Sequence, residues 1–231
     1  MSSKIVGIIG PGGEGGTFLD WSLHYLTGDP YVKYVLVDRL ENEVLGIRKH
    51  YVLFNPITHE GTSHKHCKAH PTEPLIQSCI EMYQTVDDPN INIHTLYIVP
   101  STESYANGRS YTTFVKQVAD TYTEIKLIQF HYPNIFLEDL AVRIKTKMPN
   151  NNERIEDIRA RVTIESNTDN KIIDNPNVYS LDIADMFYNL DTLIHEIFNW
   201  LSLTIKEEKY DNWLAVYKEW QLAQKFCTTT Q

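Results

Sequence analysis

The sequence predicts an α/β fold with three layers, in which helices cover both faces of a mainly parallel sheet. Two observations support this prediction. Short apolar runs rich in β-branched residues recur along the chain, and segments with helical spacing of apolar residues separate them. The first strand, helix and strand together take about 35 residues, and such a βαβ unit has a right-handed crossover that implies parallel strands.

The chain has 231 residues, which suffices for one sizeable core, so we expect a single α/β domain over residues 1–231. Its net charge of −9, with 21 dispersed lysines and arginines, disfavours a nucleic-acid-binding surface. No apolar segment approaches the roughly 20 residues of a membrane span, and we expect no membrane partner. Three cysteines without a repeated spacing, and no signal-peptide pattern, indicate a cytoplasmic protein. The sequence leaves the oligomeric state open.

The first elements follow directly from the residue pattern. Residues 4–9 form an apolar strand, and Phe18 and Leu26 belong to the apolar side of the helix that follows. Gly28-Asp29-Pro30 ends this helix, because glycine supplies a cap and proline cannot continue it. A second buried strand is expected at residues 34–38.

The middle of the chain alternates helices, strands and one long loop. Residues 41–54 are weakly helical in pattern, and residues 55–74 form a polar, histidine-rich loop whose length suggests a functional role. A helix over residues 73–84 and a strand over residues 93–99 follow. The next helix is expected over residues 101–122, with a serine or threonine as its cap.

The last part of the chain is mostly helical. A strand over residues 125–130 precedes a mostly helical stretch over residues 134–165, and a last strand is expected at residues 177–182. It leads into a helical C-terminal part, residues 182–226, in which residues 183–203 show strong amphipathic spacing. The final helix carries large aromatic side chains, which we expect to pack in the core: Tyr210, Trp213, Tyr217 and Trp220.

A glycine-rich stretch, residues 10–16, joins the first strand to the first helix and holds five glycines within seven residues. Exposed amides at a helix start and the positive end of the helix dipole attract an anion, and glycines let the backbone approach it closely. Together with Thr17, the stretch reads G-x-x-x-x-G-G-T over residues 10–17, which is the P-loop pattern with Gly16 in place of the lysine. It also satisfies the G-x-G-x-x-G pattern of dinucleotide-binding folds through Gly10, Gly12 and Gly15.

Four segments follow one another in an order that resembles a known family. Residues 14–17, Glu-Gly-Gly-Thr, are similar to a Lys-Gly-Gly-Thr loop, and residues 68–75 are similar to a Lys-Thr-His-Leu-Pro segment. Residues 96–111 resemble a strand and helix that hold a 3′-phosphate, and residues 178–187 resemble a Tyr-Glu-Asp-Leu corner. Together they resemble the P-loop sulfotransferases, which transfer a sulfuryl group from 3′-phosphoadenosine 5′-phosphosulfate to a hydroxyl or an amine.

The resemblance implies a P-loop NTPase- or sulfotransferase-like fold and a set of site residues. It implies that His70 is the catalytic base, and that the acceptor is a small molecule or a glycan held by the loops at 55–74 and 148–152. No metal is expected. The residues implied in binding the cosubstrate are Gly12, Gly13, Glu14, Gly15, Gly16, Thr17, Phe18, Arg109 and Ser110.

The chain departs from the family pattern at two positions. Glu14 stands where the family has its first-loop lysine, and a carboxylate beside a phosphosulfate is repulsive by on the order of 1 kcal/mol or more. Pro100 stands where an arginine normally follows the strand. Either Lys65 or Lys68 enters the site from the long loop, or the protein binds the nucleotide weakly or not at all.

A dinucleotide-binding fold is the main alternative for the glycine-rich stretch. Its three pattern glycines would then form the pyrophosphate turn, and Asp38, at the end of the second strand, would bind the ribose hydroxyls. The protein would be an NAD(P)- or FAD-dependent oxidoreductase. Gly16 and Thr17 weigh against this alternative, because that fold normally has apolar helix packing there.

Two further hypotheses remain. The long loop contains residue types that bind zinc, but their spacing matches no known zinc site: His59, His64, His66, Cys67 and His70. The simpler interpretation is that they are polar loop residues without a metal. The other hypothesis is a non-catalytic interaction protein on the same scaffold, which the missing lysine makes credible.

Overall fold

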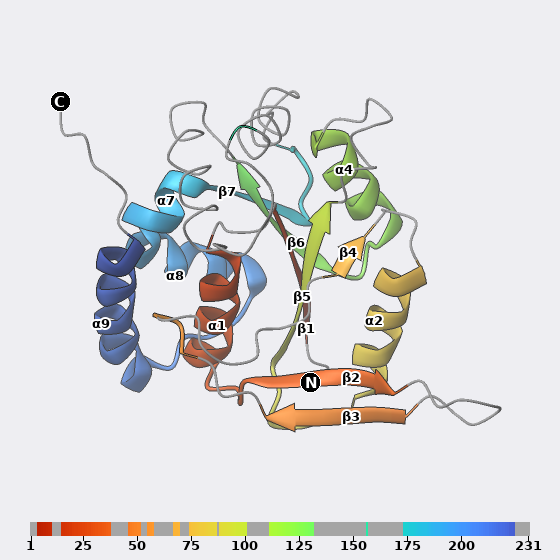
Figure 1. The fold of residues 1–231 in the computed structure, drawn as a ribbon, viewed down its shortest axis with the longest axis horizontal. Coiled ribbons are helices and arrows are strands. Elements are labelled where there is room, and N and C mark those ends of the chain that lie inside the picture. Colours follow the sequence, from red (N-terminus) through yellow and green to blue (C-terminus); the bar gives the residue numbers. More distant parts are fainter. Residues whose placement is uncertain are drawn as a thin grey trace.

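A computed structural model of the chain describes residues 4–10, 15–37, 46–51, 55–57, 67–69, 74–86, 88–100, 111–131, 156 and 173–224. Their strands and helices form a parallel sheet with helices on both faces, as Figure 1 shows. The predicted α/β fold class is therefore confirmed.

The main sheet has five strands in the order β4-β5-β1-β6-β7, and every neighbouring pair is parallel. The strands are β1 Lys4–Ile9, β4 Cys67–Ala69, β5 Ile93–Pro100, β6 Lys126–His131 and β7 Val178–Asp182. Because all five run in one direction, their carboxyl ends lie at one edge of the sheet. The central strand β1 has an almost entirely buried apolar sequence, as expected for a strand covered on both faces.

The helices divide between the two faces of the sheet (Figure 1). The face that carries His94 is covered by α2 Pro74–Thr85, whose Tyr83 stacks on that ring, and by α4 Tyr111–Thr121. The other face is covered by α1 Gly16–Thr27, α7 Ile183–Tyr188 and α8 Leu190–Leu201, with α9 Glu207–Gln224 packed on α1. None of the helices in the described part of the chain is both long and apolar enough to cross a membrane.

A separate pair of strands corrects the predicted βαβ unit. The strand β2 Val32–Val37 pairs antiparallel with β3 Gly46–Tyr51, and the two form their own sheet. Figure 1 shows this pair at the end of the molecule opposite the carboxyl ends of the main strands. The first strand, helix and strand therefore do not form a βαβ unit, because β1 pairs with β5 and β6 instead.

Two further elements differ from the sequence prediction. The weak helix expected over residues 41–54 is wrong, since the hairpin pairing places Gly46–Tyr51 in a strand opposite β2. The helix expected over residues 183–203 is two helices, because the chain bends at Asn189. The predicted long loop contains β4, and the predicted helical stretch at 134–165 lies outside the described residues apart from residue 156.

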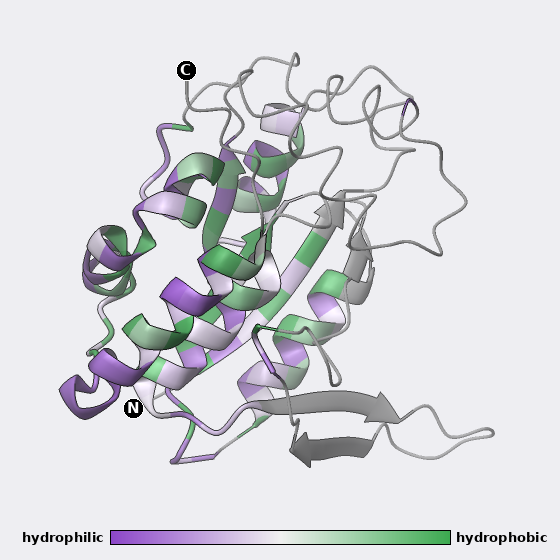
Figure 2. Ribbon diagram, turned by 60° about the vertical axis from the view of Figure 1, so that its left-hand side comes forward, coloured by the Kyte–Doolittle hydropathy of each residue, from purple (hydrophilic) through white to green (hydrophobic). Residues whose placement is uncertain are grey.

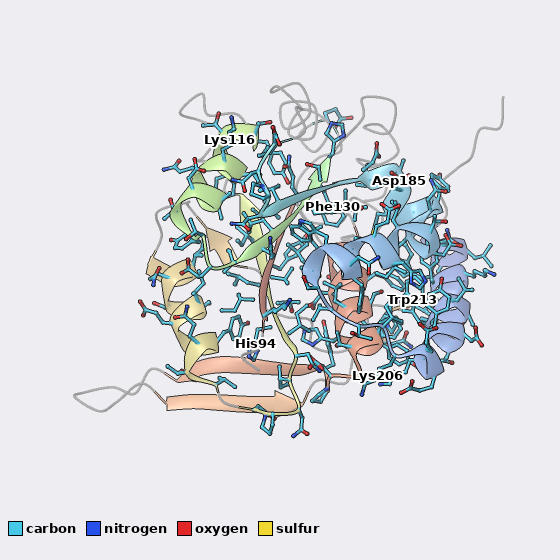
Figure 3. The ribbon with its side chains drawn as sticks, turned by 180° about the vertical axis from the view of Figure 1, so that it is seen from behind. His94, Lys116, Phe130, Asp185, Lys206 and Trp213 are labelled. Atoms are coloured by element: carbon cyan, nitrogen blue, oxygen red, sulfur yellow. The ribbon has the colours of Figure 1, made fainter. Side chains whose placement is uncertain are left out.

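The predicted core role of the aromatic residues in the last helix is confirmed for three of the four, while Tyr210 is partly buried against the core. Trp213, Tyr217 and Trp220 are buried, and Trp213 donates a hydrogen bond from Nε1 to Ser22 Oγ of α1 over 2.9 Å. Figure 3 shows Trp213 among the side chains between the helices on that side of the sheet, and Figure 2 shows apolar and polar positions alternating around the helices. These contacts fix α1, which begins at the glycine-rich stretch.

Candidate functional site

The strands of the main sheet end at its carboxyl edge, and each segment that the sequence singled out follows one of these strands in the chain. The glycine-rich stretch follows β1, His70 follows β4, and residues 101–110 follow β5. At the same edge β6 and β7 end in His131 and Asp182, which are register partners. From β1 the chain continues to β4 and β5 on one side of the sheet, and it then crosses to β6 and β7 on the other side. The direction of the strand order therefore reverses between β1 and β6, and open α/β sheets bind ligands at such a point.

The start of α1 has the features of an anion site. Gly15 is the N-cap residue, in the left-handed conformation, and as a glycine it has no side chain that could cap the helix. The first turn contains no acidic residue, so within the described part of the chain no carboxylate of that turn competes for its amides. The first amides of a helix have no partner within the helix, and together with the dipole they favour a phosphate or sulfate.

Gly15 and Gly16 are required by the fold itself. Gly15 has φ of +86°, which side chains other than glycine rarely adopt. A Cβ atom on Gly16 would lie 2.2 Å from the ring of Tyr97, so β5 and α1 approach each other too closely for a side chain. The packing of α1 against the sheet therefore accounts for these two glycines before any ligand is considered.

We expect Gly16→Ala to lower the free energy of unfolding by about 1–3 kcal/mol, because the new methyl group overlaps the buried Tyr97 ring. Urea denaturation measures this change. Thr17→Ala, next to it and half-buried, is the control, and its change should be smaller. Equal stability of Gly16→Ala and the native protein would show that α1 and β5 are not this close.

The remaining predicted site residues fall into two groups. The Phe18 ring is fully buried and stacks on Trp220 with ring centroids 4.3 Å apart, so Phe18 can offer a ligand only its main-chain amide. Thr17 is half-buried at the helix start. The others lie outside the described residues: Gly12, Gly13, Glu14, His70, Arg109 and Ser110.

The residues of the alternative sites also lie mostly outside the described part of the chain. Asp38, the predicted ribose ligand, is one of them, and the strand before it is not a neighbour of β1. Of the histidine-rich group, only Cys67 is placed, as the first residue of β4. Among the described residues no group of three or more potential ligands could hold a metal ion.

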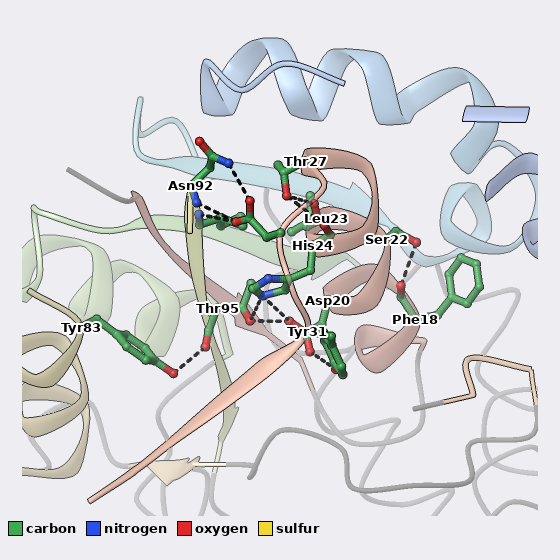
Figure 4. A network of polar contacts seen from close by, with 12 residues as sticks. Phe18, Asp20, Ser22, Leu23, His24, Thr27, Tyr31, Tyr83, Asn92 and Thr95 are labelled. Atoms are coloured by element: carbon green, nitrogen blue, oxygen red, sulfur yellow. Dashed lines mark hydrogen bonds and ion pairs between the residues drawn. The ribbon is translucent and has the colours of Figure 1, made fainter. Parts of the chain in front are cut away.

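A buried polar network joins α1 to β5 (Figure 4). Asp20 accepts hydrogen bonds from Tyr31 Oη, over 2.5 Å, and from Thr95 Oγ1. Since the Thr95 hydroxyl donates to Asp20, it accepts at 3.0 Å from His24 Nε2, which therefore carries a proton. Burial, followed by the charge of Asp20, raises the pKa of Tyr31 far above its ordinary value. The network orients α1 and anchors the residue just before β2.

A second buried histidine makes stability depend on pH. His94 is 2% exposed, and burial together with the charge of His24 lowers its pKa from 6.5 to about 4, against the opposing charges of Asp29 and Asp88. Below pH 6.5 the unfolded chain binds a proton that the native protein does not bind, so the free energy of unfolding falls as pH falls. We expect a loss of at most about 3 kcal/mol between pH 6.5 and about 4.

Urea denaturation across this pH range measures the effect. In His94→Phe, which can keep the stack on Tyr83, the dependence should become shallower. His195→Gln, at an exposed position of α8, is the control and should keep the native slope. If the free energy of unfolding of His94→Phe kept the native dependence on pH, groups other than His94 would be responsible for it.

Sequence reasoning missed a row of polar residues at the carboxyl ends of β6 and β7. Gln129 pairs in register with Ser180, and His131 pairs with Asp182. The available signal was Gln129 itself, a polar residue between Ile128 and Phe130 in an otherwise buried strand. Figure 3 shows Phe130 on this strand.

The fold and this edge define a mainly parallel α/β protein whose central strand runs through a glycine-rich stretch into a helix. No protein-family model and no curated protein matches the chain. Among solved structures, a sulfotransferase from Alicyclobacillus acidocaldarius is similar at 10% identity and a TM-score of 0.39, over 97% of this chain and 94% of that chain. The likeness is distant.

Proposed function

We propose that the protein is a sulfotransferase-like transferase that binds 3′-phosphoadenosine 5′-phosphosulfate at the carboxyl edge of its sheet and serves a hydroxyl or amine acceptor. The observation that carries this proposal is the start of α1. Its N-cap residue is Gly15, which has no side chain to cap the helix, and its first turn, which the structure describes, contains no acidic residue. This arrangement suits the phosphosulfate end of the cosubstrate.

All the predicted residues except Phe18 have a role in this function. When bound, the cosubstrate supplies an activated sulfuryl group. The amides of residues 12–17 and the Thr17 hydroxyl hold its 5′ end, and Arg109 and Ser110 hold its 3′-phosphate. His70, which follows β4 in the sequence, takes the proton of the acceptor.

The strand order supports this function over the dinucleotide-binding alternative. In chain order the main strands are arranged 2-3-1-4-5, so the first strand lies between the third and the fourth. A Rossmann sheet has the order 3-2-1-4-5-6, in which the second strand pairs with the first. The residue expected to bind the ribose would follow that second strand, and here the corresponding strand, β2, belongs to another sheet.

Thermal unfolding with 3′-phosphoadenosine 5′-phosphate, NAD and ATP in parallel tests the proposal. A ligand at about 100 times its Kd stabilises the native state by about 2.7 kcal/mol, which raises the midpoint by about 5–10 °C for a chain of this size. We expect this rise with the first compound. A rise with NAD alone would contradict the proposal, and no rise with any of the three would favour a non-catalytic interaction protein.

Two variants separate binding from transfer. His70→Ala should keep the shift with 3′-phosphoadenosine 5′-phosphate and lose transfer, because it removes only the base. Glu14→Lys should enlarge the shift, because it replaces a repulsive charge beside the phosphates with an attractive one. Unchanged transfer in His70→Ala would remove His70 from its role.

A further inference from the structure

The polar row on β6 and β7 faces the α2 and α4 side of the sheet. Register partners in a parallel sheet point to the same face, and alternate residues of one strand do so too, so Gln129, His131, Ser180 and Asp182 share a face. Tyr179, between them in sequence, contacts Trp200 of α8 on the opposite face. The row therefore lies away from α8, at the carboxyl edge.

Gln129 is the deepest member of this row. It is 0% exposed, and its neighbour across the sheet is Ile9, the last residue of β1 before the glycine-rich stretch. Neither its amide oxygen nor its amide nitrogen has a hydrogen-bond partner, and the buried Ser180 hydroxyl has none either, as far as the described residues go. A buried amide without partners is costly, and proteins retain one where it has another use.

The chemistry of the row selects the kind of ligand. An amide and a hydroxyl each donate and accept hydrogen bonds, as the hydroxyl groups of a sugar do. The Asp182 carboxylate disfavours the binding of a negatively charged ligand, because like charges repel. Burial raises the pKa of Asp182, while the Ala184 N–H and the charge of His131 oppose the rise, so His131 lies near enough to act on this carboxylate.

We propose that Gln129, Ser180, His131 and Asp182 form a binding site for a neutral, hydroxyl-bearing sugar at the carboxyl ends of β6 and β7. Gln129 and Ser180 bind the sugar from within the strands, and His131 and Asp182 bind it at the carboxyl edge of the sheet. The site adjoins the end of β1, so the sugar lies beside the start of the glycine-rich stretch. Naming this sugar the acceptor of the transfer rests on the proposed function.

The first test measures stability without any ligand. Gln129→Met keeps the length of the side chain and removes the partnerless amide, so we expect its thermal midpoint to rise by about 2–4 °C. Gln221→Leu is the matched control, because Gln221 donates to the Phe187 carbonyl over 2.5 Å, and its midpoint should fall. A fall in Gln129→Met like that of the control would show that Gln129 has a structural partner and would overturn the site.

The second test measures binding with N-acetyl-D-glucosamine as the neutral probe and D-glucuronate as its charged counterpart. The native protein should bind the neutral sugar more tightly, and Gln129→Met should bind it about tenfold more weakly. Its shift with 3′-phosphoadenosine 5′-phosphate should not change. No binding of the neutral sugar, or tighter binding of glucuronate, would overturn the ligand class. Sugar binding without nucleotide binding would support this site and contradict the proposed function.

Discussion

Replacing Trp220 by alanine is expected to lower the free energy of unfolding by about 3–5 kcal/mol. The indole is fully buried, stacks on Phe18 and Phe187 with centroids 4.3 and 5.1 Å away, and lies over Gly15. Its loss would leave a large cavity between α9 and α1. The start of α1 would lose its cover, so the affinity for 3′-phosphoadenosine 5′-phosphate should fall as well.

Urea denaturation of Trp220→Ala measures this effect, with Leu222→Ala as the control on the same helix. Leu222 is 80% exposed, and we expect its replacement to change stability by no more than about 0.5 kcal/mol. Similar stability of the two variants would show that α9 does not pack on α1 as described.

Replacing Asp20 by alanine is expected to lower the free energy of unfolding by about 2–6 kcal/mol, because it leaves two buried hydroxyl groups without their acceptor, at about 1–3 kcal/mol each. Its carboxylate is the acceptor for both the Tyr31 and the Thr95 hydroxyl, and each would lose this acceptor inside the protein. The anchor of Tyr31, just before β2, would be lost with it.

Asp20→Asn keeps one acceptor oxygen and should lose less stability than Asp20→Ala. Asp120→Ala, at an exposed position of α4, is the control and should stay within about 0.5 kcal/mol of the native protein. If Asp20→Ala matched this control, the network would contribute little to stability.

The elements that the sequence predicted well are those set by local residues. The strand Lys4–Ile9 is a continuous apolar run, and the helix after it ends at Gly28, which has φ of +77° and caps it. The pairing of the strands could not be predicted from the sequence, because β2 and the main strands have similar composition. Only the tertiary structure determines which sheet a strand joins. The parallel sheet was predicted correctly, although the βαβ unit on which the prediction rested is absent, because β2 pairs with β3 in a separate sheet.

Tertiary contacts also explain the divided helix. The apolar spacing continues through Asn189, so the sequence predicted one helix over residues 183–203. In the structure the Leu190 N–H donates to Tyr217 Oη of α9 over 3.0 Å, which satisfies an amide at the start of α8. A partner 27 residues away is invisible to a local pattern.

The part of the candidate site that the sequence predicted is the glycine-rich stretch, because glycines in this pattern indicate a tight turn. The glycine-rich stretch indicated a strand, a tight turn and a helix start, and the structure has β1 before it and α1 after it. The sequence did not show that Gly16 is required by Tyr97, since that contact joins α1 to β5. Gln129 was missed although it is a polar residue in an apolar strand, and its lack of hydrogen-bond partners among the described residues depends on the whole fold.

The proposed function requires the start of α1 to bind the phosphate end of a nucleotide. Amide resonances of Gly15, Gly16 and Thr17, followed by NMR during titration with 3′-phosphoadenosine 5′-phosphate, test it most directly, because these amides are the proposed ligands. We expect these three resonances to shift together and to saturate with the ligand, while the amide resonance of Leu222 in α9 does not shift. Binding of the nucleotide with these three amides unmoved would contradict the proposed function.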